Sequence, residues 1–534
     1  MRTRNRRRRK RTLPKLKKAP NSLQPRIEEI GAEHFGVLAV DCAKARFQVL
    51  LGNFCGTVLM EPQEFDNSGP DLEHLVETVQ HEVRRHGLKD LVVALERTGR
   101  FHHPVRTVLR RHWTVKMIHP LATKRLRQPA DPGNKTDATD LVAILRATIA
   151  GYGTDDEELS ESWAAWRLVG REREALVRHR ACVRIRIQDR MEALLPGYLA
   201  LFTDPWKMPA AFTLALDYGS AAALADAGPE ALLVHVRQPG LSMRRDTLGR
   251  ILLWAAKAAP GDPSGELLRR LVADERRLLA ALEGQIRAYE RDLLAYLVDT
   301  PFLLLVSLPG IHVVSAASYA AELGPIEHYP HPRKITGRAG LYPSRYQSDE
   351  TDHADGPLVH RRNARLRDAL MEIAHNLVRC NTYFKAWADV RRTAGWPEKT
   401  LRVAVASTFS RISYAMVAGR RLFDHPAIRG RDAILPKLTA FVLEHDIAPE
   451  AARDLLRRAA QQIPPEARPA EAEALRPTLG RRHRRGSIWT RGTGPQLLGD
   501  ILPELLTWLG LPAAPQPERN PSTPTKQERT RTPH

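Results

Sequence analysis

Four acidic side chains within the first 140 residues have the types and spacing that a metal-dependent reaction at phosphate esters uses. Asp41 and Glu96 each end a run of apolar residues, where a charge is costly unless a cation or hydrogen bonds compensate it. Asp137 and Asp140 lie three residues apart in a segment of helical periodicity, so they share one helix face. Carboxylate oxygens are the ligands that Mg²⁺ (or Mn²⁺) prefers, and two such ions stabilise the attacking and leaving oxygens at phosphorus.

Each of these acids taken singly has an ordinary alternative. Asp137 and Asp140 at the start of a helix could be capping and dipole residues, and Asp41 could be a turn acid at a strand end. The metal site is favoured only by the joint placement of all four acids on the elements that the surrounding sequence predicts.

Those elements follow the order of an α/β domain over residues 35–150. Apolar alternation and turn residues predict three strands, a helix, a strand, a helix, a strand and a final helix. We expect them at 35–41, 45–53, 56–65, 71–86, 88–96, 102–111, 113–119 and 136–150. This is the order of the RNase H-like (RuvC-like) fold, in which the first and fourth strands are neighbours and the last helix packs over them. The four acids would then meet at one point as a catalytic, metal-binding set.

A second chemical signal is a loop serine, Ser348, that precedes an arginine-rich segment. Guanidinium groups bind phosphate and its developing charge, and a serine beside them could attack a phosphodiester. A lone serine is usually just a loop residue, and a solvated helix face is the alternative for at least half of the arginines. The candidate phosphate contacts are Arg361, Arg362, Arg365 and Arg367.

The turn Pro309-Gly310 predicts a helix-hairpin-helix-like motif, because an apolar run precedes it and a small-residue helix, 313–323, follows it. In such a motif the backbone N–H groups of the turn and the helix N-terminus bind a DNA phosphate. A plain tight turn between packed helices is an equally good interpretation of these residues.

The rest of the chain is predicted to be mostly helical. From Leu268 to Tyr296 apolar residues recur at alternating steps of four and three, broken only at Glu275, which indicates a coiled-coil seam. A weaker seam, interrupted by Arg173 and Arg180, lies upstream, so the two helices could pair with each other or with a second copy. Residues 196–263 between them look like a helical insertion. The predicted divisions are a basic disordered arm (1–34), the RNase H-like domain (35–150), a coiled-coil region (151–300), a helical C-terminal domain (301–425), a helical and basic extension (426–511) and a disordered tail (512–534).

The charge balance indicates a polyanionic partner, most often nucleic acid. The net charge is +21 and the pI about 10.1. Residues 1–18 contain eleven Lys or Arg and no acid, so the remainder still carries 21 − 11 = +10. Four widely spaced cysteines argue against a disulfide framework and against structural zinc. The sequence has neither an apolar run of membrane-spanning length nor a secretory signal, so we expect a cytoplasmic location.

Five segments occurring in one order resemble the transposases of insertion-sequence family 110, over roughly residues 35–425. The resemblance implies a RuvC-like domain with an Asp-Glu-Asp-Asp set, a coiled coil, and a C-terminal transposase domain with a nucleophilic serine. Asp41, Glu96, Asp137 and Asp140 match the acids, and Ser348 matches the serine that joins to a DNA phosphate. The segments are Gly36-Val-Leu-Ala-Val-Asp-Cys-Ala-Lys44, Leu95-Glu-Arg-Thr-Gly99, Asn134-Lys-Thr-Asp-Ala-Thr-Asp140, Ser307-Leu-Pro-Gly-Ile311 and Gly340-Leu-Tyr-Pro-Ser-Arg-Tyr-Gln-Ser348.

The resemblance also implies partners. In that family a structured RNA encoded by the element base-pairs with donor and target DNA, and the protein works as a tetramer. The expected partners are therefore DNA at the element ends and target, a guide RNA, and further copies of the chain (a dimer or tetramer) at the nucleoid of a bacterial cell.

Two departures from the family pattern bear on activity more than on fold. Asp349 follows Ser348 where the family usually has Gly, and Arg362 replaces a small residue. Two alternatives therefore stay open. One is a stand-alone metal-dependent nuclease of the junction-resolvase type, in which the serine is incidental. The other is an inactive copy that only binds nucleic acid.

Overall fold

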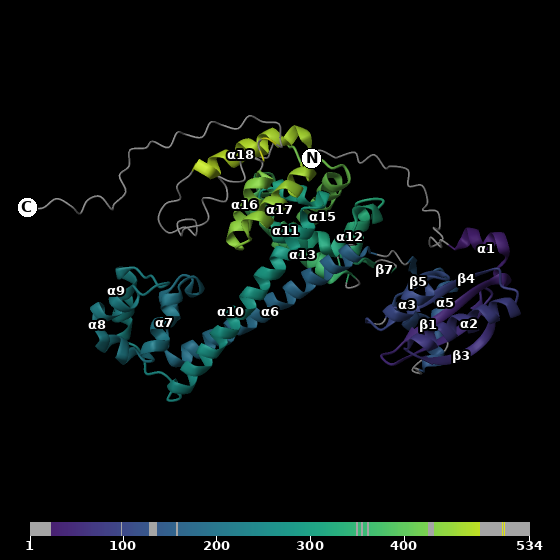
Figure 1. Ribbon diagram of the computed structural model, residues 1–534, viewed down its shortest axis with the longest axis horizontal. Helices are drawn as coiled ribbons and strands as arrows, with labels where there is room; N and C mark the ends of the chain where they lie inside the picture. The colour runs from purple at the N-terminus through teal and green to yellow at the C-terminus, as the bar shows by residue number, and fades with distance from the viewer. Residues whose placement is uncertain are drawn as a thin grey trace, which may run out of the picture. The chain divides into compact units, whose positions relative to one another are not determined.

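The chain folds into two units, residues 1–158 and 159–534, each with apolar cores of its own. The computed structural model (Figure 1) describes residues 23–97, 99–127, 136–155, 159–348, 351–353, 356–359, 362–425, 432–480, 505 and 507. The predicted arm up to residue 22, the basic stretch at 481–485 and the predicted tail lie outside the described residues. The first unit is mixed α/β and the second is mostly helical, which confirms the predicted fold class at that level.

The first unit is built on a six-stranded sheet with the order β3-β2-β1-β4-β5-β6. β1 pairs antiparallel with β2 and parallel with β4, so it lies in the centre of the sheet. β2 and β3 are antiparallel, β4 and β5 are parallel, and the two-residue β6 was not predicted. The strands are β1 (Phe35–Cys42), β2 (Arg46–Asn53), β3 (Val58–Asp66), β4 (Asp90–Glu96), β5 (Thr114–Ile118) and β6 (Thr154–Asp155).

Helices cover both faces of this sheet, and the alternation of side chains along each strand decides which residues they cover. On β1, Leu38 and Val40 pack in the core beneath α2 (Gly69–Arg85) and α3 (His102–Leu109). Val37 and Ala39 pack on the opposite face with α5 (Asp137–Ile149). α4 (Pro120–Arg127) precedes α5 and packs against it.

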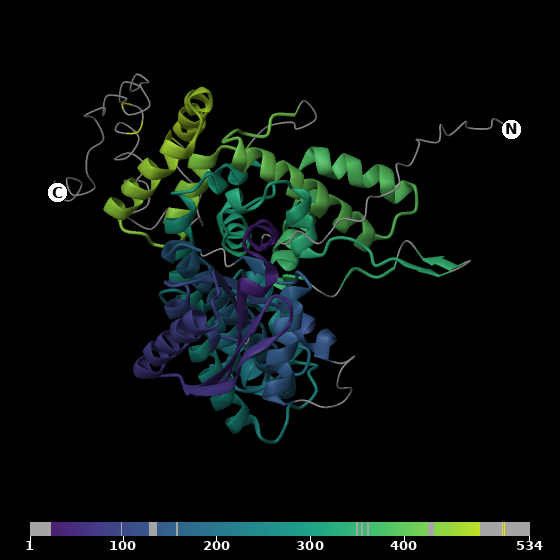
Figure 2. The same cartoon turned by 90° about the vertical axis from the view of Figure 1, so that its right-hand side faces the viewer.

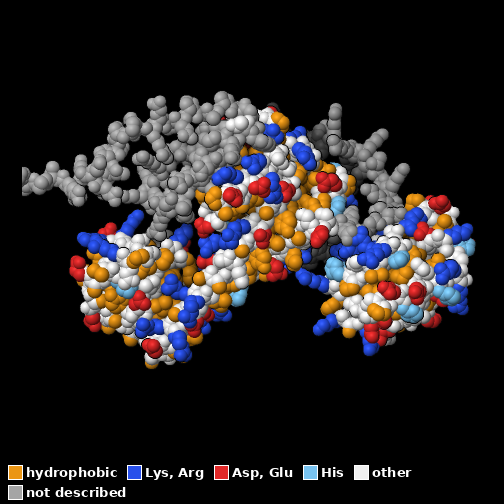
Figure 3. Space-filling view, in the orientation of Figure 1, with side chains coloured by type: hydrophobic (Ala, Val, Ile, Leu, Met, Phe, Trp, Pro, Cys, Tyr) orange, Lys and Arg blue, Asp and Glu red, His pale blue; other side chains and the backbone are white. Residues whose placement is uncertain are grey.

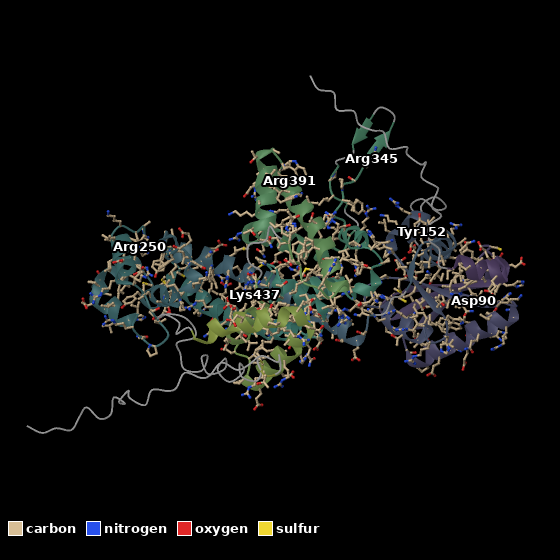
Figure 4. The ribbon with its side chains drawn as sticks, turned by 90° about the horizontal axis from the view of Figure 1, so that it is seen from above. Asp90, Tyr152, Arg250, Arg345, Arg391 and Lys437 are labelled. Atoms are coloured by element: carbon tan, nitrogen blue, oxygen red, sulfur yellow. The ribbon has the colours of Figure 1, made fainter. Side chains whose placement is uncertain are left out.

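Residues 23–34 belong to the folded unit, so the prediction of a disordered arm up to residue 34 is wrong for this stretch. α1 (Gln24–Ile30) buries Ile27 in the core that also contains α5. The Arg26 guanidinium donates to both carboxylate oxygens of Asp90, at 2.8 and 2.6 Å, and stacks over the Phe35 ring. Asp90 is labelled in Figure 4. A helix of seven residues has too short an apolar pattern to be recognised by periodicity, and it is stabilised by these tertiary contacts.

Two long helices, α6 (Glu161–Leu194) and α10 (Gly265–Leu297), form the spine of the second unit. They pair with each other along their length and in opposite directions, since Trp166 stacks on Tyr296 while Leu194 lies beside Gly265 (Figure 1). The two predicted seams therefore face each other within one chain.

Acidic and basic residues that interrupt the two apolar seams form ion pairs across them. Glu275, the one break in the α10 seam, is buried and pairs with Arg186 and Arg190 of α6. Arg173 of α6 donates to Glu290 of α10 at 3.0 and 2.6 Å. Two of the breaks in the sequence pattern, Glu275 and Arg173, thus form ion pairs with the opposite helix.

The segment between the two long helices forms a small bundle at one end of the pair, as the predicted insertion requires (Figure 1). Its apolar residues share a core with Val183 and Ile187 of α6 and with Val272 of α10. Its helices are α7 (Pro209–Tyr218), α8 (Ala221–His235) and α9 (Arg245–Ala255).

The other end of the pair joins a larger helical body, in which one continuous core runs from Trp166 and Leu293 to Leu475. The predicted division at residue 425 does not separate two cores, because α16 and α17 pack on the same 3-10 segment η4 as α15. The elements are η4 (Pro301–Ser307), α11 (Val313–Leu323), α12 (Arg333–Ala339), β7 (Tyr346–Ser348), β8 (Thr351–His353), α13 (Ala364–Cys380), α14 (Thr382–Thr393), α15 (Glu398–Ala418), α16 (Ile434–Glu444), α17 (Pro449–Gln462) and α18 (Arg468–Gly480).

Glu290 is expected to be the most important acid of the α6–α10 pair. Its carboxylate contacts Arg173 and, at 2.9 Å, the ring of His445, which follows α16; all three side chains are at most one quarter exposed. Glu290→Ala should lower the free energy of unfolding of the full chain by about 2 kcal/mol, because it leaves buried polar groups unpaired. Chemical denaturation measures this change.

Glu283→Ala is the matched control on the same helix. Glu283 pairs with Arg184 at 2.7 Å, but both side chains are about one third exposed. Its loss should cost less than about 1 kcal/mol. Equal effects of the two substitutions would contradict the central role of Glu290.

Candidate functional site

The two strand acids lie side by side on the face of the sheet that α5 covers. Val40 of β1 is the register partner of Leu95 of β4, so the next residues along the two parallel strands are Asp41 and Glu96. Both follow the alternation that places Ala39 and Ala94 in the α5 core. Both carboxylates are only partly exposed.

The two helix acids come from the first turn of α5. Thr136 caps this helix: its hydroxyl accepts a hydrogen bond from the Thr139 N–H, and the Thr139 hydroxyl accepts one from the Thr136 N–H. Thr136 therefore fills the capping position, and the helix-dipole alternative stays open for Asp137 and Asp140, because both lie in the first turn. Asp137 is exposed, whereas Asp140 is 7 % exposed and faces the sheet side of the helix.

The four carboxylates act on one another electrostatically. The pKa of Asp41 is raised from 3.8 to about 6, mostly by burial and then by the negative charges of Glu96, Asp140 and Asp137 in that order, while a hydrogen bond from the Cys42 backbone N–H lowers it. The other three predicted acids therefore lie near enough to Asp41 for their charges to raise its pKa. An excess of negative charge in a partly buried place is the electrostatic condition for binding a cation.

The donor set fits a divalent cation, but the two helix acids are at present turned to other partners. The Arg127 guanidinium at the end of α4 donates to Oδ1 of Asp140. The side-chain amide of Gln48 donates to Oδ2 of Asp137 at 3.2 Å. Among the residues that the structure describes, no three His, Cys, Asp or Glu side chains converge as a group that could hold a metal ion. Oxygen ligands are therefore available, and their convergence requires Asp137 and Asp140 to change partners.

Gln48 and Arg127 are site residues that the sequence analysis missed. A signal for Gln48 existed, because the antiparallel pairing of β1 and β2 makes it the register partner of Asp41. Arg127 had none, since it precedes a polar segment and approaches Asp140 only when α4 packs on α5.

Ser348 is the last residue of β7, in a hairpin that projects from the helices of the second unit (Figure 2). Ser348 is the register partner of Thr351, but its side chain lies outside the described part of the structure. At the base of the hairpin the Ser344 N–H and hydroxyl both donate to the Pro357 carbonyl oxygen at 2.9 Å. The neighbouring Arg345 is labelled in Figure 4, where the hairpin stands clear of the helical body.

The four candidate arginines differ in their surroundings. Arg367 is 8 % exposed, and its guanidinium donates to the carbonyl oxygens of Ala339, Gly340 and Val359, so its prediction as a phosphate contact is wrong. It ties the end of α12 to the base of the Ser348 hairpin. Arg365 pairs with Glu174 at 3.1 Å in a partly exposed place, and Arg362 is exposed. Arg361 lies outside the described residues.

The Pro309-Gly310 turn is packed inside the helical body. Gly310 is buried with φ +91°, and a Cβ added there would lie 2.8 Å from the carbonyl oxygen of Asn376 on α13. The ammonium group of Lys437 (labelled in Figure 4) donates to the carbonyls of Val306 and Ile311 on either side of the turn, each at 2.9 Å. This geometry favours the plain tight turn over a DNA contact at Gly310.

The basic residues are not gathered into one patch on the face drawn in Figure 3. Lys and Arg side chains are spread over its coloured surface together with Asp and Glu. No helix in the described part of the chain is long and apolar enough to span a membrane.

The raised pKa of Asp41 predicts that the site costs stability. Because the folded-state pKa (about 6) exceeds the ordinary 3.8, the folded chain binds more protons between these values, and stability falls as the pH rises through this window. Asp41→Asn should therefore raise the free energy of unfolding at pH 7.5 without metal, by on the order of 1 kcal/mol after allowance for the exposed part of the carboxylate. The gain should vanish below about pH 4, where both states are protonated. Thermal unfolding in EDTA as a function of pH measures it, and a destabilised variant at pH 7.5 would refute it.

Arg367 and Arg365 provide a second test on one helix. Arg367→Ala removes the hydrogen bonds to three backbone carbonyls and should lower the free energy of unfolding by about 2–3 kcal/mol. Arg365→Ala removes a partly exposed ion pair and should cost less than about 1 kcal/mol. Urea unfolding of the full chain compares them, and the reverse order would show that Arg367 is not a structural clamp.

Two protein-family models match this chain, one over the region of the four acids and one over the region of the Ser348 hairpin. A transposase family model of the IS110 type, named for an Asp-Glu-Asp-Asp (DEDD) set, matches residues 38–199, and so covers the four acids. The transposase IS116/IS110/IS902 family matches residues 303–388, and so covers the Ser348 hairpin. No match is found among curated proteins. A domain of the Asp-Glu-Asp-Asp type indicates a divalent metal cation. With both domains present in one order, the chain belongs to the IS110 family of insertion-sequence DNA transposases.

Proposed function

We propose that this transposase cuts and rejoins DNA with two sets of groups, a divalent metal site formed by Asp41, Glu96, Asp137 and Asp140, and a nucleophilic serine, Ser348. The observation that carries the metal site is the effect of Glu96, Asp140 and Asp137 on the pKa of Asp41. The four carboxylates come from three separate elements, β1, β4 and α5, and clustered acids with a raised pKa are typical of functional sites.

The sheet supports an RNase H-like assignment for this unit. Three antiparallel strands lead into β4 and β5, which run parallel to β1, and the central position of β1 follows from the order β3-β2-β1-β4-β5. This is the strand order that the RNase H-like interpretation requires. The acids lie on the two central parallel strands and on the last helix of the domain, α5.

The four acids of the proposed metal site are held in two different ways. Asp41 and Glu96 are fixed by the register of two buried strands, whereas Asp137 and Asp140 are carried by α5 and can turn from their present partners. Bound Mg²⁺ or Mn²⁺ would supply a positive charge for phosphate oxygens at this place. The protein's own contribution is to fix the positions of the strand carboxylates and to carry the helix carboxylates beside them.

Ser348 is proposed to attack a phosphodiester of DNA. Its Oγ forms a bond to phosphorus as the bond from phosphorus to one sugar oxygen breaks, and the serine proton passes to that freed oxygen. The number of phosphate ester bonds is unchanged, so the reverse reaction with another sugar hydroxyl reseals the strand without an energy source. The position of Ser348 near the end of a projecting hairpin favours access to a DNA backbone.

A guide RNA and further copies of the chain are proposed as partners on the strength of the family. The net charge of +21 favours nucleic-acid partners. The α6–α10 seam is buried within a single chain, so any homo-oligomer must use other surfaces.

The serine step is tested with Ser348→Ala and the control Ser344→Ala. Ser344 lies in the same hairpin, and its hydroxyl bonds the Pro357 carbonyl within the base. A plasmid containing the DNA that flanks the gene is incubated with the chain, the RNA transcribed from that flank, and Mg²⁺. Covalent protein–DNA adducts are then counted on denaturing gels. We expect Ser348→Ala to abolish the adduct and Ser344→Ala to retain it. Cleavage that persists in Ser348→Ala would support the stand-alone nuclease instead.

The metal site is tested with the double variant Asp41→Asn/Glu96→Gln in the same plasmid assay. We expect strand cleavage to fall by about 100-fold or more, because two of four oxygen ligands lose their charge. The variant should still bind DNA, as measured by gel shift. Binding by the wild type with no metal-dependent cleavage under any condition would favour a copy that only binds nucleic acid.

A further inference from the structure

Arg127 is the last residue of α4, and its guanidinium contacts Oδ1 of Asp140. Both side chains are largely withdrawn from water, with 15 % of Arg127 and 9 % of Asp140 exposed. An ion pair shielded in this way is held more firmly than the exposed pairs elsewhere on the chain, because solvent screens it less. It is also placed within the acid set that the proposed function assigns to a cation.

The other helix acid is held differently. Asp137 is exposed and accepts a hydrogen bond from the neutral amide of Gln48, which also donates to Glu64 at 3.1 Å. Gln48 can give up Asp137 without separating charges. Asp140 can leave Arg127 only if another positive charge replaces the guanidinium, since an unpaired buried carboxylate is costly.

We propose that Arg127 is the counter-ion of Asp140 in the metal-free protein, that it leaves Asp140 when a divalent cation binds, and that it thereby sets the metal affinity of the site. This inference rests on the proposed metal site. Two effects lower the affinity together: the guanidinium occupies one of the carboxylate oxygens, and its positive charge repels an incoming cation. Arg127 is thus a residue that determines affinity and not a metal ligand.

A positioning role makes the opposite prediction. If Arg127 served only to orient Asp140 toward a metal ion, its loss would weaken metal binding, as the loss of an outer-shell partner usually does. If Arg127 only tied α4 to α5, its loss would change stability and leave metal affinity as it was. The sign of the change in affinity therefore separates the three roles.

The experiment is a titration of the full chain with MnCl₂ at pH 7.5, followed by calorimetry. Arg127→Gln should bind Mn²⁺ about 10-fold more tightly than the wild type, since a tenfold change corresponds to the removal of a modest opposing charge. Arg127→Lys, which keeps the charge but loses the planar fork, should lie between them. Arg125→Gln is the matched control, because Arg125 is an exposed arginine in the same last turn of α4. It should leave the affinity unchanged. Unchanged or weaker binding in Arg127→Gln would overturn the proposal.

Thermal unfolding supplies a second measurement that does not require activity. In EDTA, Arg127→Gln should unfold at a lower temperature than Arg125→Gln, because Asp140 then faces the other acids without a counter-ion. Saturating Mn²⁺ should raise the unfolding temperature of Arg127→Gln more than that of the wild type, as its tighter binding requires. An equal rise in both proteins would contradict the proposal.

The double variant Asp41→Asn/Glu96→Gln separates this inference from the proposed function. If it binds Mn²⁺ as the wild type does, the acids are not the metal site, and the proposed function and the inference fall together. If it loses binding while Arg127→Gln matches the wild type, the metal site stands and only the role of Arg127 is wrong.

Discussion

Repulsion among four carboxylates is the constraint around which the first unit is organised. Asp41 and Glu96 are fixed next to each other by the pairing of two parallel strands, and α5 adds Asp137 and Asp140 to the same place. A fold selected for stability alone would not gather these charges, because each one raises the cost of ionising Asp41. The surrounding sheet is correspondingly apolar on both faces, and its burial offsets the cost of the site.

In the second unit acidic side chains are paired with basic ones instead of lying beside other acids. Several of its acids have basic partners across helix interfaces: Glu275 pairs with two arginines of α6, and Glu290 pairs with Arg173 and His445. Glu322 of α11 likewise receives Arg171 of α6 and Asn363, the cap of α13, at 2.6 and 3.1 Å. These paired charges fix the register of helices that small apolar residues alone would hold less specifically. The rigid body that results supports the hairpin of Ser348 through Arg367.

The contrast between the two units locates function. The paired acids of the second unit stabilise helix contacts. In the first unit the four candidate acids lie near one another, and Asp140 pairs with Arg127 of α4. The region matched by the Asp-Glu-Asp-Asp model thus holds the acids that act on Asp41, and the region matched by the second transposase model holds the projecting hairpin.

The sequence by itself determined the central strands and the last helix of the first unit, and it singled out the four candidate acids. Strand alternation and helix periodicity are local, so β1, β4 and α5 were predicted within two residues, and with them the faces that carry Asp41, Glu96 and Asp140. Only the tertiary structure decided which charged side chains form ion pairs or hydrogen bonds. Arg367 and Arg365 are two residues apart on one helix, yet one is buried on three carbonyls and the other stays partly exposed. Arg127 contacts Asp140 because α4 packs on α5. The ion pair between Arg26 and Asp90 likewise stabilises α1. Such pairings depend on the distance between residues far apart in the chain, which no local pattern records.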